Sequence, residues 1–276
     1  MILLASGVLA QVLISAKTDK LASLDKGIAA WAQSLSGDAE NKFTNGLIHF
    51  LNEMLEILVV IFCAVLVFVV LYDALIIKLR FKAYMEHYLY MVVGVAATLV
   101  LSFGTLCIMK SALNRPRPWQ TEEFHRMGAT DAECWAKFWP AYRKFPEKEK
   151  CADYEYASCP SGHTLTVAIM GFLASYLSYY NLLVTKKVHR LTKFSTVFWS
   201  IVTACCVVST IIFVPTVMIA RMADLKHYFT DVTGGLGLAL VYASLLVLFR
   251  PYLPSIVSQE EGADESQVLD SEQPIV

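Results

Sequence analysis

The sequence has few charged residues and no surplus of either sign. Of its 276 residues only 17% are charged, and the formal net charge is -1. A soluble domain of this length would carry more charge and fewer apolar residues than the 56% found here. There is also no basic excess of the kind that attracts nucleic acid. These shortages argue against a nucleic-acid partner and favour a polytopic membrane protein that folds as one helical domain.

The seven cysteines include no pair separated by two residues, the spacing typical of a structural zinc site. Four of them fall within apolar runs, where a small buried thiol is the ordinary interpretation. The other three, Cys134, Cys151 and Cys159, fall in one long polar loop. Two of these three could form a disulfide on an oxidising face, and the sequence does not select the pair.

Apolar runs of about 20 residues predict membrane-spanning helices. The clear candidates are residues 55–77, 88–109, 164–184, 195–218 and 230–250. Residues 1–15 are also apolar but short. A retained span is favoured there over a signal peptide, because no basic residue precedes the run. The predicted fold is therefore an all-α membrane bundle of about six helices.

The segment 22–50 mixes apolar and polar residues. Leu24, Ile28, Trp31 and Leu35 recur there at helical spacing, which predicts an amphipathic helix at the membrane interface.

Basic residues set the predicted orientation. They gather in two short turns, after the 55–77 span and after the 164–184 span: Lys78, Arg80 and Lys82, then Lys186, Lys187, Arg190 and Lys193. By the positive-inside rule both turns are cytoplasmic. The loop 113–159 then lies on the extracytoplasmic or luminal face. Residues 1–256 are expected to form the membrane domain, and the acidic tail 257–276 to be disordered and cytoplasmic.

Three polar clusters stand at the ends of apolar runs. They are Lys110 with Arg117-Pro118, then Pro160-Ser161-Gly162-His163, then Arg221 with His227 and Asp231. Ionisable residues beside membrane spans are costly and are functional candidates for that reason. No span separates the first two clusters and two spans separate the second from the third, so all three fall on the outer face. Three cations suit an anion, and two histidines with a carboxylate suit acid–base or nucleophilic chemistry.

Each cluster also has a local interpretation. Pro116 and Pro118 are expected to end the helix that carries Lys110. Gly162 and Ser161 stand at a helix N-terminus, where unpaired N–H groups bind anions. His227 and Asp231 are four residues apart and would share a face of a helix.

Taken together, the clusters resemble the type 2 phosphatidic acid phosphatase superfamily. Its pattern is Lys, six residues, Arg-Pro; then Pro-Ser-Gly-His; then Ser-Arg, five residues, His, three residues, Asp. This chain matches all of it between residues 110 and 231 except that Ala220 replaces the Ser. The stretch RMADLKHYFTDV also looks like the lipid phosphate phosphatase branch.

The resemblance implies a role for each matching residue. His227 would be the nucleophile that forms a phosphohistidine, Asp231 would orient it, and His163 would protonate the leaving oxygen. The remaining matches, Lys110, Arg117, Ser161, Gly162 and Arg221, would hold the phosphate oxygens. No carboxylate cluster suited to Mg²⁺ is apparent in the outer regions, so neither a metal nor another cofactor is expected.

The implied substrate is an amphiphile whose phosphate lies at the membrane surface. Candidates are phosphatidic acid, lysophosphatidic acid, sphingoid-base phosphates and polyprenyl pyrophosphates. Aromatic residues of the loop 119–158 either cap the site or form an interfacial belt. A phosphotransferase, a sugar-phosphate phosphatase and a non-enzymatic protein with a vestigial site stay open as alternatives. The sequence does not define the oligomeric state.

Overall fold

The computed structural model describes residues 22–36, 82–113, 115–120, 158–188 and 193–248, with isolated helical positions at 50, 57, 61 and 64. Every regular element in these ranges is helical, as predicted. The elements are α2 (Ala22–Ser36), α4 (Lys82–Leu113), the short 3-10 turn η2 (Pro118–Gln120), α5 (Gly162–Val188), α6 (Lys193–Ala223) and α7 (Phe229–Leu248).

Four of these helices are long and apolar enough to cross a membrane. Their candidate spans are Met91–Leu113, Gly162–Leu183, Thr196–Ala223 and Phe229–Leu248. They confirm four of the predicted spans, with ends shifted by about one turn. The predicted total of six is not established. Residues 1–15, most of 55–77, the loop 121–157 and the tail 257–276 lie outside the described residues.

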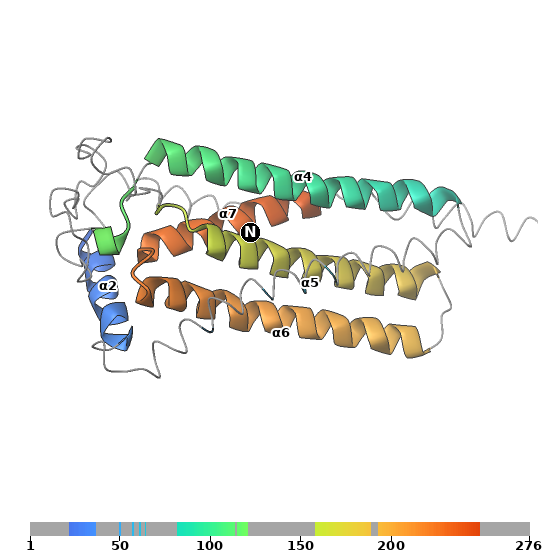
Figure 1. The fold of residues 1–276 in the computed structure, drawn as a ribbon. Coiled ribbons are helices and arrows are strands. Elements are labelled where there is room, and N and C mark those ends of the chain that lie inside the picture. Colours follow the sequence, from blue (N-terminus) through green and yellow to red (C-terminus); the bar gives the residue numbers. More distant parts are fainter. Residues whose placement is uncertain are drawn as a thin grey trace, which may run out of the picture.

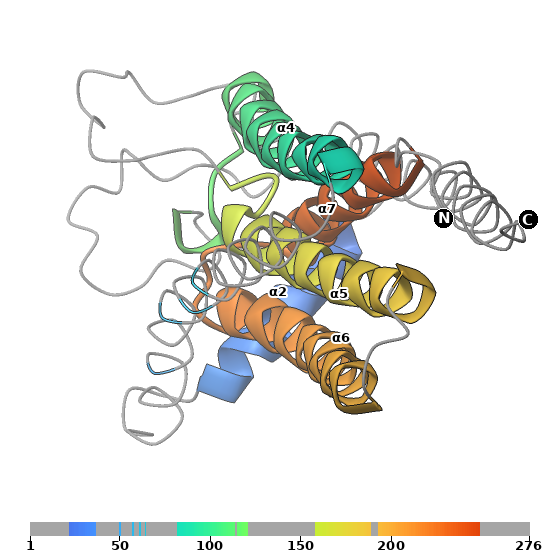
Figure 2. The same cartoon turned by 90° about the vertical axis from the view of Figure 1, so that its right-hand side faces the viewer.

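The four long helices run side by side, and α2 lies across one end of the bundle (Figures 1 and 2). α5 packs against both α6 and α7, and α4 packs chiefly against α7. The spans of α5 and α7 are 56% and 50% buried, compared with 22% for α4 and 17% for α6. α5 and α7 therefore form the centre of the bundle, while α4 and α6 turn apolar faces outward.

These outward faces carry large apolar side chains. Val100 and Ile108 of α4 are each 71% exposed, and Ile211 of α6 is 66% exposed. A continuous surface of this kind is unfavourable in water but matches lipid tails. The faces of α4 and α6 therefore support the interpretation of the bundle as membrane-embedded.

Small residues let the central helices approach closely. A Cβ atom built on Gly235 of α7 would lie 2.5 Å from the Ser161 carbonyl oxygen. The start of α7 therefore packs directly against the start of α5. A residue without a side chain is therefore needed at position 235 for this close packing.

Local sequence explains why several helices end near one another. α4 ends at Leu113, just before Pro116 and Pro118, neither of which has an N–H to continue a helix. α6 ends at Ala223, and the following turn has Leu225 in the left-handed region with φ 54°. α7 then begins at Phe229. As a result, the ends of α4 and α6 and the starts of α5 and α7 meet where α2 crosses the bundle (Figure 1).

Candidate active site

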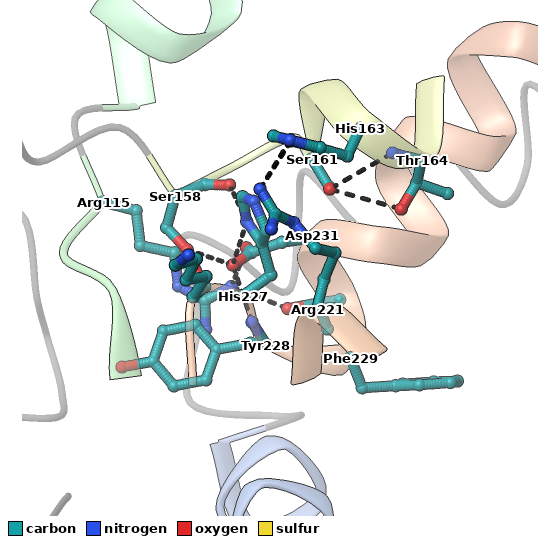
Figure 3. A network of polar contacts seen from close by, with 12 residues as sticks. Arg115, Ser158, Ser161, His163, Thr164, Arg221, His227, Tyr228, Phe229 and Asp231 are labelled. Carbon is teal, nitrogen blue, oxygen red and sulfur yellow. Dashed lines mark hydrogen bonds and ion pairs between the residues drawn. The ribbon is translucent and has the colours of Figure 1, made fainter. Parts of the chain in front are cut away.

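The second and third polar clusters predicted from the sequence meet at the end of the bundle that α2 crosses (Figure 3), and Lys110 of the first cluster reaches the start of α5 there. Lys110 is in the last turn of α4 and Arg221 is in the last turn of α6. The remaining residues either follow α4 (Arg117), stand at the start of α5 (Ser161, Gly162 and His163) or flank the start of α7 (His227 and Asp231). Residues more than 100 positions apart in the chain are thereby brought to one site.

His163 and Arg221 are in direct contact. The Arg221 Nη2 atom lies 2.8 Å from Nδ1 and 2.6 Å from Nε2 of His163. Arg221 is 6% exposed and can only donate, so the imidazole offers it a ring lone pair. Figure 3 shows the two side chains pointing toward one another, with His227 close by. The contact joins the second and third clusters.

His227 is held by a backbone carbonyl. Its Nδ1 lies 2.8 Å from the Ser158 carbonyl oxygen, which can only accept, so Nδ1 carries the proton and Nε2 the lone pair. The Asp231 Oδ2 atom is 3.8 Å from Nδ1, which is too long for a hydrogen bond. His227 also precedes α7 by two residues, so it does not share a helical face with Asp231 as the spacing suggested.

Burial decides the charge of His227. The side chain is 4% exposed. Desolvation lowers the pKa of His227 below its ordinary value, and the nearby Asp231 only partly opposes this effect. Arg221 and Arg117 lower the pKa further by charge repulsion. The imidazole is therefore neutral at neutral pH, the form that can act as a nucleophile.

Asp231 is fully buried, and its carboxylate is occupied by partners other than His227. Oδ1 accepts a hydrogen bond from Arg115 Nη1 at 2.7 Å. Oδ2 accepts from the Tyr228 amide at 2.9 Å and from the Ser158 hydroxyl. Because the Ser158 carbonyl accepts from His227, Asp231 reaches the imidazole through Ser158.

Arg115, which the sequence analysis did not single out, is the centre of a buried charge network. It is 1% exposed, and its guanidinium lies 4.1 Å from the centre of the Tyr228 ring. Besides Asp231 it donates to Asp25 Oδ2 at 2.9 Å and to Thr230 Oγ1 at 2.7 Å. Desolvation would lower the pKa of Arg115, but the Asp231 and Asp25 carboxylates outweigh it and raise the pKa. The guanidinium stays charged.

The remaining predicted phosphate ligands surround the start of α5. The Ser161 hydroxyl oxygen accepts from the Thr164 hydroxyl at 3.2 Å and, more weakly, from the Thr164 amide at 3.5 Å. This is the arrangement of an N-cap. A Cβ atom on Gly162 would lie 3.9 Å from Lys110 Nζ, so the lysine ammonium reaches the N-terminus of the helix.

Two further observations bear on the predictions. Cys159 is a buried free thiol in the structure, so it is not one of a disulfide pair. Burial also raises the pKa of this thiol well above its ordinary value. Cys134 and Cys151 lie outside the described residues. Within the described ranges, no three His, Cys, Asp or Glu side chains are close enough to hold a metal ion.

The residues that the sequence analysis missed had weak signals. Arg115 is the first arginine of an Arg-Pro-Arg-Pro stretch, two residues before Arg117. Asp25 is the one acidic residue in the segment 22–36. The residues that share its helical face, Ala29 and Ala32, are small and apolar. Such an acid is a candidate for a buried partner, but the sequence does not name that partner.

Comparisons with known proteins identify one family. A sequence model of the PAP2 superfamily matches residues 87–254, which is more than half of the chain. Among solved structures, the first transmembrane PAP2 type phosphatidylglycerolphosphate phosphatase from Bacillus subtilis is similar. It has 20% sequence identity and a TM-score of 0.46, over 89% of this chain and 94% of that chain. No curated protein sequence matches the chain.

Proposed function

This chain belongs to the PAP2 superfamily, and we propose that it is a metal-independent integral membrane phosphatase acting on a lipid phosphate. The observation that carries the proposal is the meeting of both histidines with Arg221 at one end of the bundle. Arg221 contacts His163 directly, and its charge acts on the buried, neutral His227. A nucleophile, a proton carrier and a fixed cation therefore stand together.

In the first step the Nε2 lone pair of His227 attacks phosphorus. The bond from phosphorus to the lipid oxygen breaks as the bond to Nε2 forms, which gives a phosphohistidine. The hydrogen bond from Nδ1 to the Ser158 carbonyl supports this role, because it keeps the proton off Nε2. Asp231 supports the orientation of His227 indirectly, because it accepts a hydrogen bond from the Ser158 hydroxyl and so fixes the residue whose carbonyl binds Nδ1.

His163 moves the protons. Once the bound phosphate has displaced it from Arg221, it takes up a proton from the solvent and donates this proton to the leaving lipid oxygen, so that the product departs as a neutral alcohol. It then takes a proton from the water that attacks the phosphohistidine, and the bond from phosphorus to Nε2 breaks. Inorganic phosphate leaves, His163 releases the proton to the solvent as it returns to Arg221, and both histidines regain their starting states.

The cations stabilise the charge on the phosphoryl oxygens. Lys110 reaches the start of α5, Arg221 contacts His163 there, and the charge of Arg117 acts on His227. The Ser161 and Gly162 segment adds backbone dipoles. A bound phosphate would compete with His163 for the Arg221 guanidinium. The present contact of 2.6 Å between Arg221 and His163 would therefore open on binding, which frees the imidazole to carry a proton.

The position of the site favours a lipid substrate on the outer face. The site lies at one end of four membrane-length helices, close to the level of a phosphate headgroup. Basic residues of the helices mark the opposite end: Lys82 begins α4, Lys186 and Lys187 lie in the last turn of α5, and Lys193 begins α6. By the positive-inside rule that end is cytoplasmic, which supports an extracytoplasmic or luminal site.

The test is phosphate release by the detergent-purified protein in EDTA. The substrates are phosphatidic acid, lysophosphatidic acid, a sphingoid-base phosphate, a polyprenyl pyrophosphate and glucose 6-phosphate. His227→Ala is the test variant. His87→Ala is the matched control, because residue 87 lies in α4 near the end opposite the site. We expect EDTA-resistant release that His227→Ala abolishes and His87→Ala retains.

Other results assign the alternatives. A phosphohistidine that forms without phosphate release indicates a phosphotransferase. Preference for glucose 6-phosphate indicates a sugar-phosphate phosphatase. The absence of both release and phosphohistidine from folded protein refutes the enzymatic proposal.

A further inference from the structure

Asp25 brings a carboxylate from α2 into the polar network at the end of the bundle. It is 1% exposed, although the apolar residues Leu24 and Trp31 of the same helix are 42% and 50% exposed. The helix therefore turns Asp25 inward and Leu24 and Trp31 outward. Asp25 also lies outside the range 87–254 that matches the superfamily.

The first contact of Asp25 is with the start of α7. Oδ1 accepts from the Thr230 amide at 3.0 Å, and Oδ2 accepts from the Thr230 hydroxyl at 2.6 Å. The amides of the first helical turn have no partner within their own helix, and a carboxylate satisfies them best. Asp25, which belongs to α2, thus caps the N-terminus of α7. The capped residue, Thr230, directly precedes Asp231.

The second contact is with Arg115. Asp25 Oδ2 accepts from Nη2 at 2.9 Å, while Asp231 Oδ1 accepts from Nη1 at 2.7 Å. Thr230 Oγ1 accepts from the same Nη1 at 2.7 Å. The two carboxylates hold the guanidinium from two sides and fix its plane. Asp25, Arg115, Asp231 and Ser158 then form a continuous chain of hydrogen bonds that ends at His227 Nδ1.

We propose that Asp25 is a positioning residue for the reaction, which sets the orientation of His227 through Arg115, Asp231 and Ser158. This inference rests on the proposed function. Asp25 touches no reacting atom in that mechanism; it determines where Asp231 and the start of α7 lie. Docking of α2 by itself would not require an acid, because an apolar side chain packs there without the cost of a buried charge.

The test compares Asp25→Asn with Lys26→Gln in the full-length protein. The asparagine keeps the size of the side chain but loses the charge and presents an N–H where Arg115 also donates. The neighbouring Lys26 is exposed and provides the matched control on α2. The readouts are kcat for phosphatidic acid hydrolysis and the inhibition constant of orthovanadate, which reports on the anion site.

For Asp25→Asn we expect kcat to fall by about 10- to 100-fold, as when an outer contact of a catalytic group is lost. The vanadate constant should stay within about a factor of three, because Lys110, Arg117 and Arg221 are untouched. Lys26→Gln should change neither. A general loosening of the fold would instead weaken vanadate binding in parallel with kcat.

A milder pair keeps the proposal testable if Asp25→Asn fails to fold. Thr230→Val removes the hydroxyl between Asp25 and Arg115 and leaves every charge in place. Thr233→Val is its control, because among the described residues the Thr233 hydroxyl bonds to the Phe229 and Thr230 carbonyls of its own helix. Thr230→Val should lower kcat with vanadate binding retained, and Thr233→Val should not.

The outcomes separate the two proposals. If Asp25→Asn folds and has the kcat of the wild type, the positioning role is refuted and the proposed function is unaffected. If only Thr230→Val folds, a wild-type kcat in that variant has the same meaning. A parallel loss of kcat and vanadate binding also refutes the positioning role. A wild-type protein that releases no phosphate from any lipid refutes the proposed function and the positioning role together.

Discussion

Replacement of Arg115 by methionine should destabilise the protein strongly. Methionine keeps the apolar length that packs on Tyr228 but removes the charge. Asp25, Asp231 and Thr230 then lose donors at 2.9, 2.7 and 2.7 Å, and two buried carboxylates are left without a cation. Removal of one partner from a buried ion pair costs about 3–5 kcal/mol. For a domain of this size that corresponds to a fall in Tm of about 6–20 °C.

The assay is thermal unfolding of the detergent-purified protein, with Arg117→Met as the matched control. Arg117 is two residues away and only half-buried, and it is a predicted phosphate ligand. Arg115→Met should therefore lower Tm. Arg117→Met should weaken substrate binding and lower Tm by less than Arg115→Met, because the Arg117 side chain is only half-buried.

The pH dependence gives a second check of the same prediction. Burial raises the pKa of the Asp25 carboxyl, and Arg115 is the strongest opposing influence. Without Arg115 the folded-state pKa rises further above the unfolded value of about 3.9. A raised folded-state pKa gives stability at low pH that is lost as the pH rises through it. The difference in Tm between wild type and Arg115→Met should therefore grow from pH 5 to pH 8. Equal Tm values for wild type and variant, or a deficit that shrinks with rising pH, would refute the reasoning.

Two further predictions follow from the close packing of α7 and from the burial of His227. Gly235→Ala should lower both Tm and phosphate release, because the new Cβ would lie 2.5 Å from the Ser161 carbonyl oxygen. Gly104→Ala is the control and should change neither, because a Cβ at position 104 meets no described atom within 4 Å. A wild-type Tm in Gly235→Ala would show that the two helices separate freely. Since burial lowers the folded-state pKa of His227, the unfolded chain binds protons first, and wild-type stability should fall as the pH drops below about 6.5. His227→Gln should reduce that slope, and an unchanged slope in a pH-dependent Tm series would contradict the burial argument.

Hydropathy and spacing were sufficient for the spans and for the residues that meet at the site. Four apolar runs became four long helices, because a segment in lipid must satisfy its own backbone. The same topology placed the second and third clusters at one end, where His163 contacts Arg221. The helix that carries Lys110 ended before Pro116 and Pro118 as expected. Each of these outcomes depends on local sequence.

The contacts that fix the site were not available from spacing. A separation of four residues suggested that His227 and Asp231 share a helix, but the Tyr228 amide bonds to the Asp231 carboxylate and the helix begins only at Phe229. Arg115 pairs with acids 90 residues before it and 116 residues after it. Such partners are set by the packing of distant helices in the folded bundle. The local spacing of residues in a single sequence does not predict that packing.

The contact between Asp25 and Thr230 joins residues 205 positions apart. During synthesis α2 leaves the ribosome long before α7, so its buried acid has no partner while the intervening helices enter the membrane. The cations of α4 and α6 are likewise in place before His227 exists. Assembly of the site therefore waits for α7. A chain arrested before residue 227 holds the proposed phosphate ligands but lacks the proposed nucleophile, so the proposed phosphate release requires that α7 has docked against α2.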